Sequence, residues 1–550
     1  MAKPEQTDIY SFLKSVSERY ASRPAFFGRQ GTAENHTWVP LTYSDVCHHA
    51  EKLAQKLVSL GLEKSDRVLI LAKSRPEYSV GFFGIPLAGG IIVPVDIRLS
   101  LADQKFISEF SEAKFVLCMN DETRAIGEKL VQNSAQELRL LNINDVMTED
   151  LAVTADLTSL SRPPDETFLM AFTSGTTSQP KAVMLTFKSV HFQVDLAGEL
   201  FSTKKDFRLL SILPLHHMFE ITGGFLLPFS RGGSVYYANS LIPHQIISFF
   251  KENKIRDLLV VPLFLRTLKK GIESEIRTSA LKRIWFYSTL RLARFIPSKS
   301  IRRILFYPLH KKFGGELHQI ISGASALDLK VGKFFDLIGV SVFEGYGMTE
   351  TAPVISCSSP GVKKPGSIGK ALEGIEVKLH PETQEILVRG PIVMQGYFKN
   401  PEATAACISA DGWFNTGDVG EIDSDGFITI KGRNKDLIVL GSGKKVAPEE
   451  VEESLREIPN VQEICVLGMK SSQGATKGTE IVTAVVVVNP ADAILQEQIQ
   501  KSLHQATMQL SYYKRPSKFI FLTEPLPKTT TLKVKKNLVK ELLLKQRITV

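Results

Sequence analysis

Short apolar runs alternate with helical patterns through the first half of the chain. The runs at 66–72, 91–95, 113–119, 207–214, 233–238 and 257–262 have the length and composition of buried strands. The segment 76–88, between the first two runs, has the pattern of a helix. Because strands that alternate with helices build parallel sheets covered on both faces, this pattern predicts an α/β fold with large sheets.

The pattern changes after about residue 367. The segments 375–390 and 420–433 each contain two strand-like runs joined by a polar turn, and Asp425-Gly426 is a hairpin signal. A compact tail follows, with a helix near 448–458, a strand at 481–488 and a helix near 492–508. We therefore place a domain boundary at about 433, which separates residues 1–433 from residues 434–550.

The longest uncharged run, 78–95, resembles a membrane span only in its length. It contains Pro86, Pro94 and four glycines, and it ends in a strand-like segment. We expect a helix followed by a buried strand inside a core rather than a transmembrane helix. The first twenty residues have no apolar signal region, and the five cysteines contain no C-x-x-C pair. These features favour a reducing compartment and a cytoplasmic protein.

Composition excludes disorder, collagen and coiled coil as descriptions of the whole chain, since 43% of residues are hydrophobic and 23% are charged. The formal net charge is +9, and its location is informative. Residues 282–312 contain no Asp or Glu and nine basic residues, namely Lys282, Arg283, Arg291, Arg294, Lys299, Arg302, Arg303, Lys311 and Lys312. Outside this segment, basic and acidic residues are equal in number, so the whole excess can be assigned to it.

Aromatic residues and leucines are mixed with these basic residues, and three interpretations stay open. The segment could lie on the surface of an anionic bilayer, form a solvated basic helix pair over the core, or bind an acidic protein or nucleic acid. We favour peripheral contact with the cytoplasmic face of a membrane and expect no nucleic-acid partner. Charge reversal at Arg291, Arg294, Arg302 and Arg303 should then release the protein from anionic vesicles.

The first candidate for chemistry is the segment Thr173-Ser174-Gly175-Thr176-Thr177-Ser178-Gln179-Pro180-Lys181, which follows an apolar run. Small hydroxyl residues around a glycine leave N–H and O–H donors free to wrap an anion, and the lysine adds a cation. The segment lacks the Gly-Lys-Ser/Thr ending of a P-loop. A hydroxyl-rich turn of this kind is often only a turn, so its context decides.

That context is an ordered set of further motifs: GYGMTE (345–350), GWFNTGD (412–418), GRNKDLI (432–438), VAPEEVE (446–452) and PKTTTLKVKK (527–536). Together they resemble the AMP-forming acyl-adenylating superfamily, within it the branch of long-chain acyl-CoA synthetases and acyl-[acyl-carrier-protein] synthetases. The resemblance implies a large N-terminal domain of two packed α/β subdomains plus a β-barrel-like subdomain. A small, mobile α+β C-terminal domain would follow.

The resemblance also implies site residues. Glu350 matches the magnesium carboxylate, Thr349 the hydroxyl on the α-phosphate, and Tyr346 the ring that stacks on adenine. Asp418 and Arg433 match the two ribose contacts, since an acceptor-only carboxylate suits two O–H donors. The implied nucleotide-binding set is Thr173, Ser174, Gly175, Thr176, Thr177, Lys181, Gly345, Tyr346, Gly347, Thr349, Asp418 and Arg433.

Lys533 matches the C-terminal catalytic lysine of the superfamily, which would bridge the substrate carboxylate and the α-phosphate. Lys435 is our choice for the hinge, where rotation would withdraw Lys533 after adenylation. The chain departs from the usual glycines at Ser178, Ala182 and Leu532. Two of these are small residues, and long-chain members commonly lack the third glycine, so we expect activity. A non-catalytic lipid or nucleotide binder is the alternative.

The segment 213–220, LPLHHMFE, resembles the long-chain branch, and His217 would line the acyl entrance beside the α-phosphate. A packed core histidine is the alternative. Gly323 and Ala324 match a turn beside the acyl chain. The implied reaction uses ATP and Mg²⁺ to convert a long-chain fatty acid into acyl-AMP and pyrophosphate. Transfer to a thiol follows, with coenzyme A as the expected acceptor and acyl carrier protein as the alternative.

Overall fold

The structure is a computed structural model, and it describes residues 7–31, 36–173, 180–201, 207–240, 242–455, 458–471, 478–488, 493–528 and 534–545. These residues divide into two compact units. The larger unit holds the described residues up to Glu376 together with Arg389–Trp413, and the smaller unit holds Val377–Val388 and the described residues from Phe414 onward. The boundary that we placed at 433 stays a prediction.

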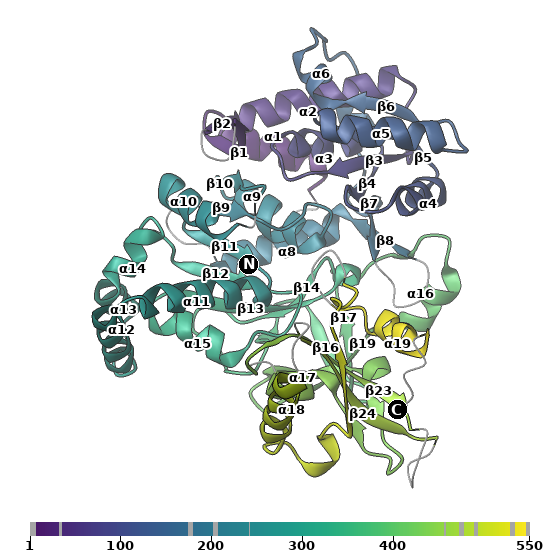
Figure 1. Cartoon of the computed structure of the whole chain (residues 1–550). Coiled ribbons are helices and arrows are strands. Elements are labelled where there is room, and N and C mark those ends of the chain that lie inside the picture. Colours follow the sequence, from purple (N-terminus) through teal and green to yellow (C-terminus); the bar gives the residue numbers. More distant parts are fainter. Residues whose placement is uncertain are drawn as a thin grey trace. The chain divides into compact units, whose positions relative to one another are not determined.

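A seven-stranded sheet forms the first part of the larger unit (Figure 1). In order, its strands are β18 (Gly396–Tyr397), β8 (Lys181–Thr186), β7 (Thr167–Thr173), β4 (Ile91–Asp96), β3 (Arg67–Ala72), β5 (Ala113–Cys118) and β6 (Arg139–Asn142). The five strands from β7 to β6 are parallel, whereas β8 and β18 run antiparallel to their neighbours. The predicted strands at 66–72, 91–95 and 113–119 are confirmed.

A nine-stranded sheet forms the second part of the larger unit. In order, its strands are β15 (Lys370–Ala371), β14 (Val354–Cys357), β13 (Ser341–Gly347), β12 (Gln319–Ser322), β11 (Asp257–Val260), β9 (Arg208–Ser211), β10 (Ser234–Tyr237), β1 (Pro24–Gly31) and β2 (His36–Thr42). The strands from β13 to β1 pair in parallel, which leaves antiparallel pairs only near the two edges. The α/β class predicted from the alternating pattern is confirmed.

The uncharged run 78–95 folds as helix α3 (Glu77–Leu87) followed by strand β4, as predicted. Every residue of α3 from Tyr78 to Leu87 is buried, because α2 (Tyr43–Ser59) covers one side and β3 and β4 the other (Figure 1). Gly81 permits this packing, since a Cβ there would lie 2.6 Å from Cδ1 of Ile70. Within the described ranges, no helix is both long enough and apolar enough to cross a bilayer.

The helices α10 (Pro243–Asn253), α11 (Pro262–Arg277), α12 (Ala280–Ala293), α13 (Lys299–Leu305), α14 (Tyr307–Lys312) and α15 (Leu329–Leu337) share one hydrophobic core with strands of the nine-stranded sheet. The basic segment 282–312 therefore folds as three short helices, with α12 packed on α11 and α13 packed on α15. In Figure 1 α12 and α13 form the outer edge of this helical layer.

The remaining helices of the larger unit are α1 (Ile9–Arg19), α4 (Leu101–Ser111), α5 (Asp121–Asn133), α6 (Ile143–Thr148), α7 (Leu157–Leu160), α8 (Phe187–Phe201), the π-helix η1 (Glu220–Leu226), α9 (Leu227–Ser230), the short turn η2 (Thr349–Thr351) and α16 (Pro401–Cys407). Several helices of the larger unit begin with side-chain caps. An example is α2, where the hydroxyl of Thr42 accepts a hydrogen bond from the amide of Asp45.

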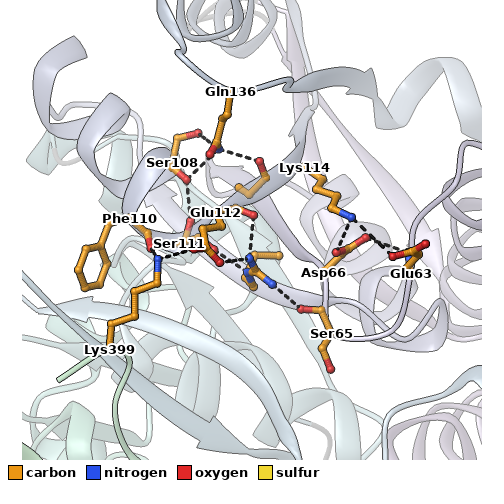
Figure 2. Close-up of polar contacts among 12 residues, drawn as sticks. Glu63, Ser65, Asp66, Ser108, Phe110, Ser111, Glu112, Lys114, Gln136 and Lys399 are labelled. Carbon is orange, nitrogen blue, oxygen red and sulfur yellow. Dashed lines mark hydrogen bonds and ion pairs between the residues drawn. The ribbon is translucent and has the colours of Figure 1, made fainter. Parts of the chain in front are cut away.

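A polar network ties the segment that carries β18 to the end of α4 (Figure 2). Nζ of Lys399 donates to the carbonyl of Phe110 at 3.1 Å and to Oε1 of Glu112 at 2.7 Å. The same Glu112 accepts from Arg67 of β3 at 2.8 Å, and this contact together with the Lys399 hydrogen bond lowers the pKa of Glu112. Lys399 follows Tyr397 by two residues, so the network fixes the strand that presents Tyr397.

The smaller unit contains a four-stranded sheet with the order β16 (Glu376–Leu379), β17 (Glu385–Arg389), β19 (Phe414–Ile422) and β20 (Ile428–Arg433). Antiparallel pairing of β19 with β20 confirms the hairpin predicted around Asp425-Gly426. After the turn η3 (Asn434–Asp436) come β21 (Ile438–Val439), β22 (Lys445–Val446), α17 (Pro448–Leu455), β23 (Val461–Lys470), β24 (Glu480–Val488), α18 (Ala493–Thr507), the turn η5 (Tyr512–Lys514), β25 (Lys518–Leu522) and α19 (Lys536–Lys545). The predicted helices and strand of the tail are confirmed.

Candidate active site

The predicted phosphate loop begins and ends on paired strands. Thr173 closes β7, Lys181 opens β8, and the two residues are register partners in the antiparallel ladder. The hydroxyl of Thr173 donates weakly, at 3.5 Å, to the carbonyl of Lys181. Ser174, Gly175, Thr176 and Thr177 lie outside the described residues, so their predicted roles stay predictions. The structure places the two ends of the loop side by side at the same edge of the seven-stranded sheet.

Lys181, Tyr397 and Glu350 form a short chain of contacts. Nζ of Lys181 lies 4.6 Å from the centroid of the Tyr397 ring, a cation–π distance. The Tyr397 hydroxyl donates to Oε1 of Glu350 at 2.9 Å. Burial and the neighbouring Glu350 carboxylate raise the pKa of Tyr397, so this hydroxyl keeps its proton. The arrangement links the cation beside the predicted phosphate loop to the predicted magnesium carboxylate.

Glu350 is buried in η2, and its backbone carbonyl accepts from the amide of Met394 at 2.9 Å. The tyrosine uses one carboxylate oxygen and leaves the other for a further ligand. This fits Mg²⁺, which commonly takes one or two protein carboxylates together with phosphate oxygens and water. Among the described residues, no group of three or more His, Cys, Asp or Glu side chains is arranged as a metal site.

Gly345, Tyr346 and Gly347 end strand β13, and the two glycines differ in their surroundings. A Cβ on Gly347 would lie 1.8 Å from the carbonyl oxygen of Pro353, so only glycine fits there. A Cβ on Gly345 would meet Cys357 at 3.8 Å, an ordinary contact. Thr349 follows at the start of η2, one residue before Glu350. The motif therefore places Tyr346, Thr349 and Glu350 along one continuous strand and turn.

Two histidines follow strand β9. The ring centroids of His216 and His217 lie 4.0 Å apart, and Nε2 of His216 lies 3.5 Å from Oδ2 of Asp96 at the end of β4. Burial lowers the pKa of His216 to about 3 and that of His217 to about 4, so both rings are neutral near pH 7. Nε2 of His217 is buried and has no hydrogen-bond partner among the described residues. A ligand atom could satisfy it.

Phe219 connects the two segments predicted to meet the acyl chain. It lies two residues after His217, and a Cβ on Gly323 would lie 2.8 Å from Cζ of its ring. Gly323 is buried directly after β12, whereas Ala324 is exposed and has a positive φ of 67°. The structure thus brings the segment that carries His217 and Phe219 against Gly323.

The two predicted ribose contacts belong to the smaller unit. Asp418 of β19 and Arg433 of β20 are register partners, and Nε of Arg433 lies 3.0 Å from Oδ1 of Asp418. The buried Asp418 also receives support from Thr416, whose hydroxyl accepts the Asp418 amide at 3.1 Å. Lys435 lies in η3, immediately after this hairpin. Lys533 lies outside the described residues.

Sequence reasoning missed Tyr397 and Asp96. Tyr397 is preceded by Gly396, with φ of 144°, and followed by the Asn400-Pro401 start of α16. These turn residues could be seen in the sequence, but a tyrosine beside a turn usually only packs against its neighbours. Asp96 ends an apolar strand, the position at which parallel sheets present functional side chains. Only the folded chain shows that it reaches His216.

Comparison with known proteins places these observations in a family. The model of the AMP-binding enzyme family matches residues 13–398, and that of the AMP-binding enzyme C-terminal domain matches residues 450–533. A long-chain-fatty-acid–CoA ligase of Mycobacterium bovis is 28% identical over 555 residues, covering 92% of this chain and 91% of that protein.

Two further relatives extend the comparison. A chloroplastic long-chain-fatty-acid–[acyl-carrier-protein] ligase of Arabidopsis thaliana is 26% identical over 627 residues, covering 96% of this chain and 84% of that protein. The crystal structure of ATP-bound MatB from Rhodopseudomonas palustris superposes with a TM-score of 0.75 at 26% identity, covering 98% of this chain and 99% of that one.

The fold and the matched motifs define an AMP-forming ligase that joins an acid to a thiol through an acyl-adenylate. The chain belongs to the AMP-binding enzyme family, and the superfamily resemblance drawn from its motifs is confirmed. The non-catalytic binder considered as an alternative gives way to an enzyme.

Proposed function

We propose that this ligase activates a long-chain fatty acid with ATP and transfers the acyl group to coenzyme A. The observation that carries the activation step is the chain from Lys181 through Tyr397 to Glu350, at the edge where β7 and β8 flank the predicted phosphate loop. It provides a cation and an oriented carboxylate beside a segment rich in hydroxyl and amide donors. Such an arrangement suits a polyphosphate and its metal ion.

In the first step a carboxylate oxygen of the acid attacks the α-phosphorus of ATP, and pyrophosphate leaves with the electrons of the broken P–O bond. Lys181 would neutralise charge on the departing phosphates, and the Thr349 hydroxyl would donate to the α-phosphate. Glu350 would hold Mg²⁺, which when bound supplies Lewis-acid stabilisation of phosphate charge. Lys533 would neutralise the acid and the α-phosphate as they approach each other.

In the second step the thiol sulfur attacks the carbonyl carbon of the acyl-adenylate. AMP leaves as the C–O bond breaks, and the thiol proton passes to solvent. Asp418 and Arg433 would hold the ribose during both steps. Rotation at Lys435 would exchange Lys533 for another face of the C-terminal domain between the steps.

The proposal of a fatty acid rests on the uncharged rings of His216 and His217 and on the apolar contact beside them. Both histidines are half-buried and uncharged near pH 7, so their rings offer hydrogen bonding without adding a cation. Phe219 and Gly323 provide an apolar wall and a close backbone approach in the same place. Burial of an acyl chain contributes about 0.8 kcal/mol per CH₂, which makes an apolar path the expected selector. The names of two relatives, which specify long-chain fatty acids, support the same substrate.

Acyl carrier protein is the second candidate acceptor, because one relative is named for it. Both acceptors present the same phosphopantetheine thiol and differ in the anionic body attached to it. The deciding experiment offers palmitate, ATP and Mg²⁺ with coenzyme A or with holo acyl carrier protein in parallel. Palmitoyl-CoA with release of AMP is the expected product. Acylation of the carrier protein alone would select the second acceptor, and no palmitate-dependent exchange of pyrophosphate into ATP would refute the fatty-acid assignment.

A further inference from the structure

Helix α12 has apolar residues on two opposite sides. At 3.6 residues per turn, Leu281, Ile284, Trp285 and Leu292 fall within an arc of about 100°, and all four are exposed. On the opposite side Phe286 and Ala293 are buried. A surface helix normally shows one apolar arc, which faces the core. The outer arc of α12 therefore has no core to explain it.

The inner arc holds α12 firmly in place. The Phe286 ring lies 5.5 Å from that of Phe306 and 6.1 Å from that of Phe334, and all three rings belong to the core beneath the nine-stranded sheet. The exposed arc is thus the outer side of a helix whose inner side is packed in the core.

Further exposed apolar residues follow α12 in the chain. Phe295 follows the helix and is 84% exposed, and Ile304 of α13 and Tyr307 at the start of α14 are 72% and 61% exposed. We call this set the outer face: Leu281, Ile284, Trp285, Leu292, Phe295, Ile301, Ile304 and Tyr307. The three helices that carry this set are neighbours, since α12 contacts α13 and α13 contacts α14. A group of exposed large apolar side chains on neighbouring elements of a folded unit usually marks an interaction site.

The basic residues around this face divide into two groups. Arg302 donates to the carbonyls of Ile296 and Asp336 and to the Asp336 carboxylate, and Arg303 donates to the carbonyls of Leu317 and Gly315. Lys299 pairs with Asp336, and Lys312 pairs with Glu275. These four residues tie the helices to the body. The guanidinium groups of Arg302 and Arg303 are thus already engaged within the protein, and the expectation that these two residues serve a bilayer stays a prediction.

The other five cations have no ion pair or side-chain hydrogen bond within the part of the chain that the structure describes: Lys282, Arg283, Arg291, Arg294 and Lys311. On the helical wheel of α12, Arg291 lies about 20° beyond one edge of the exposed apolar arc and Lys282 about 60° beyond the other, whereas Arg283 lies farther round the helix. Arg294 follows α12 as its C-cap. No acidic residue occurs between 282 and 312. An apolar arc flanked by cations is the arrangement of a helix that lies in the plane of an anionic bilayer surface.

We propose that the outer face and its five unpaired cations dock this enzyme on an anionic lipid surface, with α12 lying parallel to the membrane plane. Charge complementarity selects this occupant. If two copies of the chain met through this face about a two-fold axis, two sets of unpaired cations would come together without an acidic partner. An acidic protein would pair with the cations, but it would not explain why so many large apolar side chains are exposed.

The docking goes beyond the proposed function and does not depend on it, since lipid binding requires neither ATP nor an acid. The test is co-sedimentation of the full chain with vesicles of equal parts phosphatidylcholine and phosphatidylglycerol, without nucleotide. Arg291→Glu/Arg294→Glu changes the charge by four units and should weaken binding on the order of 500-fold, given about fivefold per unit charge near the headgroups. Ile284→Ser/Phe295→Ser should weaken it about tenfold or more through lost apolar burial.

The matched control is Lys129→Glu/Lys251→Glu, which reverses two exposed lysines on other helices of the same unit and should bind like the unaltered chain. Thermal unfolding of each variant checks that the fold is retained. Turnover of a soluble short-chain acid should be unchanged in all of them. Absence of palmitate-dependent exchange of pyrophosphate into ATP in every protein, with vesicle binding intact, would count against the proposed function and leave the docking standing.

Three results would overturn the docking. One is vesicle binding that is absent in the unaltered chain, or that is as strong in both outer-face variants as in the unaltered chain. Another is a concentration-dependent dimer in sedimentation velocity that Ile284→Ser/Phe295→Ser abolishes while vesicles are not bound. The third is capture of acyl carrier protein through Arg291 and Arg294 by a chain that does not bind anionic vesicles.

Discussion

The hydroxyl of Tyr397 points at the carboxylate of Glu350 and donates to it at 2.9 Å. The two residues are 47 positions apart and come from β18 and η2. The ring of the same tyrosine lies against the ammonium group of Lys181. Tyr397 thus orients a carboxylate through its hydroxyl and a cation through its face, which makes it a positioning residue for both.

Removal of this hydroxyl should weaken nucleotide use more than it weakens folding. We expect Tyr397→Phe to raise the KM for Mg²⁺-ATP about tenfold, because Glu350 loses the donor that fixes its rotamer. The stability loss should be about 1.5–3 kcal/mol, the usual range for a hydrogen bond to a charged group. Acid-dependent pyrophosphate–ATP exchange, measured across a range of Mg²⁺ concentrations, checks the first, and urea unfolding checks the second.

A second tyrosine provides the control. Tyr10 of α1 donates to Oε1 of Glu51 at the same distance, 2.9 Å, away from every residue of the candidate site. Tyr10→Phe should leave the KM for Mg²⁺-ATP unchanged. If both substitutions change that KM equally, the Tyr397 bond is only structural.

Lys533 should act in one half-reaction only. We expect Lys533→Ala to reduce adenylation by about 10²–10⁴-fold while a supplied acyl-adenylate still reacts with the thiol, since only the first step brings two anions together. Stopped-flow measurement of each half-reaction separates the two steps. Lys535→Ala, two residues away at an exposed position, is the matched control and should affect neither step. Equal losses in both steps for Lys533→Ala would contradict the exchange of C-terminal faces.

Glu220 is a fully buried carboxyl at the start of the π-helix after the histidines. Ser211 donates a hydrogen bond to it, and the buried hydroxyl of Tyr237 has no hydrogen-bond partner among the described residues. Burial raises the pKa of Glu220 to about 8, so the folded protein keeps the carboxyl neutral near pH 7.

This shift predicts a pH-dependent stability with a defined sign. Between pH about 4.5 and about 8 the folded state holds a proton that the unfolded state has released. The free energy of unfolding should therefore fall as pH rises through this window, by up to about 1.4 kcal/mol per pH unit. Glu220→Gln stays neutral at every pH and should lose this dependence.

The measurement is urea unfolding of both proteins at pH 5, 6.5 and 8, where the difference between them separates the effect of Glu220 from that of the half-buried His216 and His217. Their lowered pKa values affect both proteins alike. Glu128→Gln, at an exposed position on α5, should behave like the unaltered chain at each pH. A constant difference between Glu220→Gln and the unaltered chain would show that the carboxyl is ionised in the fold.

Arginines within the basic segment should differ sharply in their effect on stability. Arg302 makes one hydrogen bond to the carbonyl of Ile296 and two to Asp336, and its side chain is 11% exposed, whereas Arg294 is exposed and unpaired among the described residues. We expect Arg302→Ala to lower the free energy of unfolding by about 1–3 kcal/mol and Arg294→Ala to change it by less than about 0.5 kcal/mol. Denaturant unfolding of the two variants checks this, and equal losses would show that both arginines are structural.

Much of the fold could be predicted because buried segments have a recognisable hydrophobic pattern in the sequence. The apolar runs that became β3, β4 and β5 are buried on both faces, so they are continuous in sequence. The helix α3 could be predicted because its apolar run is buried, and the Asp425-Gly426 hairpin could be predicted from its turn residues. Signature motifs singled out Glu350, Asp418 and Arg433 as candidates before any geometry was known, and their roles stay predictions.

The features that escaped prediction depend on contacts between distant segments. Tyr397 gains its role only when β18 pairs with β8. Arg302 and Arg294 look alike in the sequence, and only the position of Asp336 on α15 separates a structural tie from an unpaired charge. The neutral state of Glu220 follows from the packing that surrounds it, which a linear motif does not encode.

Helix α12 separates its attachment from its outward surface. Phe286 and Ala293 fix it to the body, while a different set of side chains meets the surroundings. Natural variation can therefore rework the outward set residue by residue without endangering the core, and protein engineers can do the same. For the same reason, substitutions in the outward side chains could change the surface to which the enzyme binds without altering its active site.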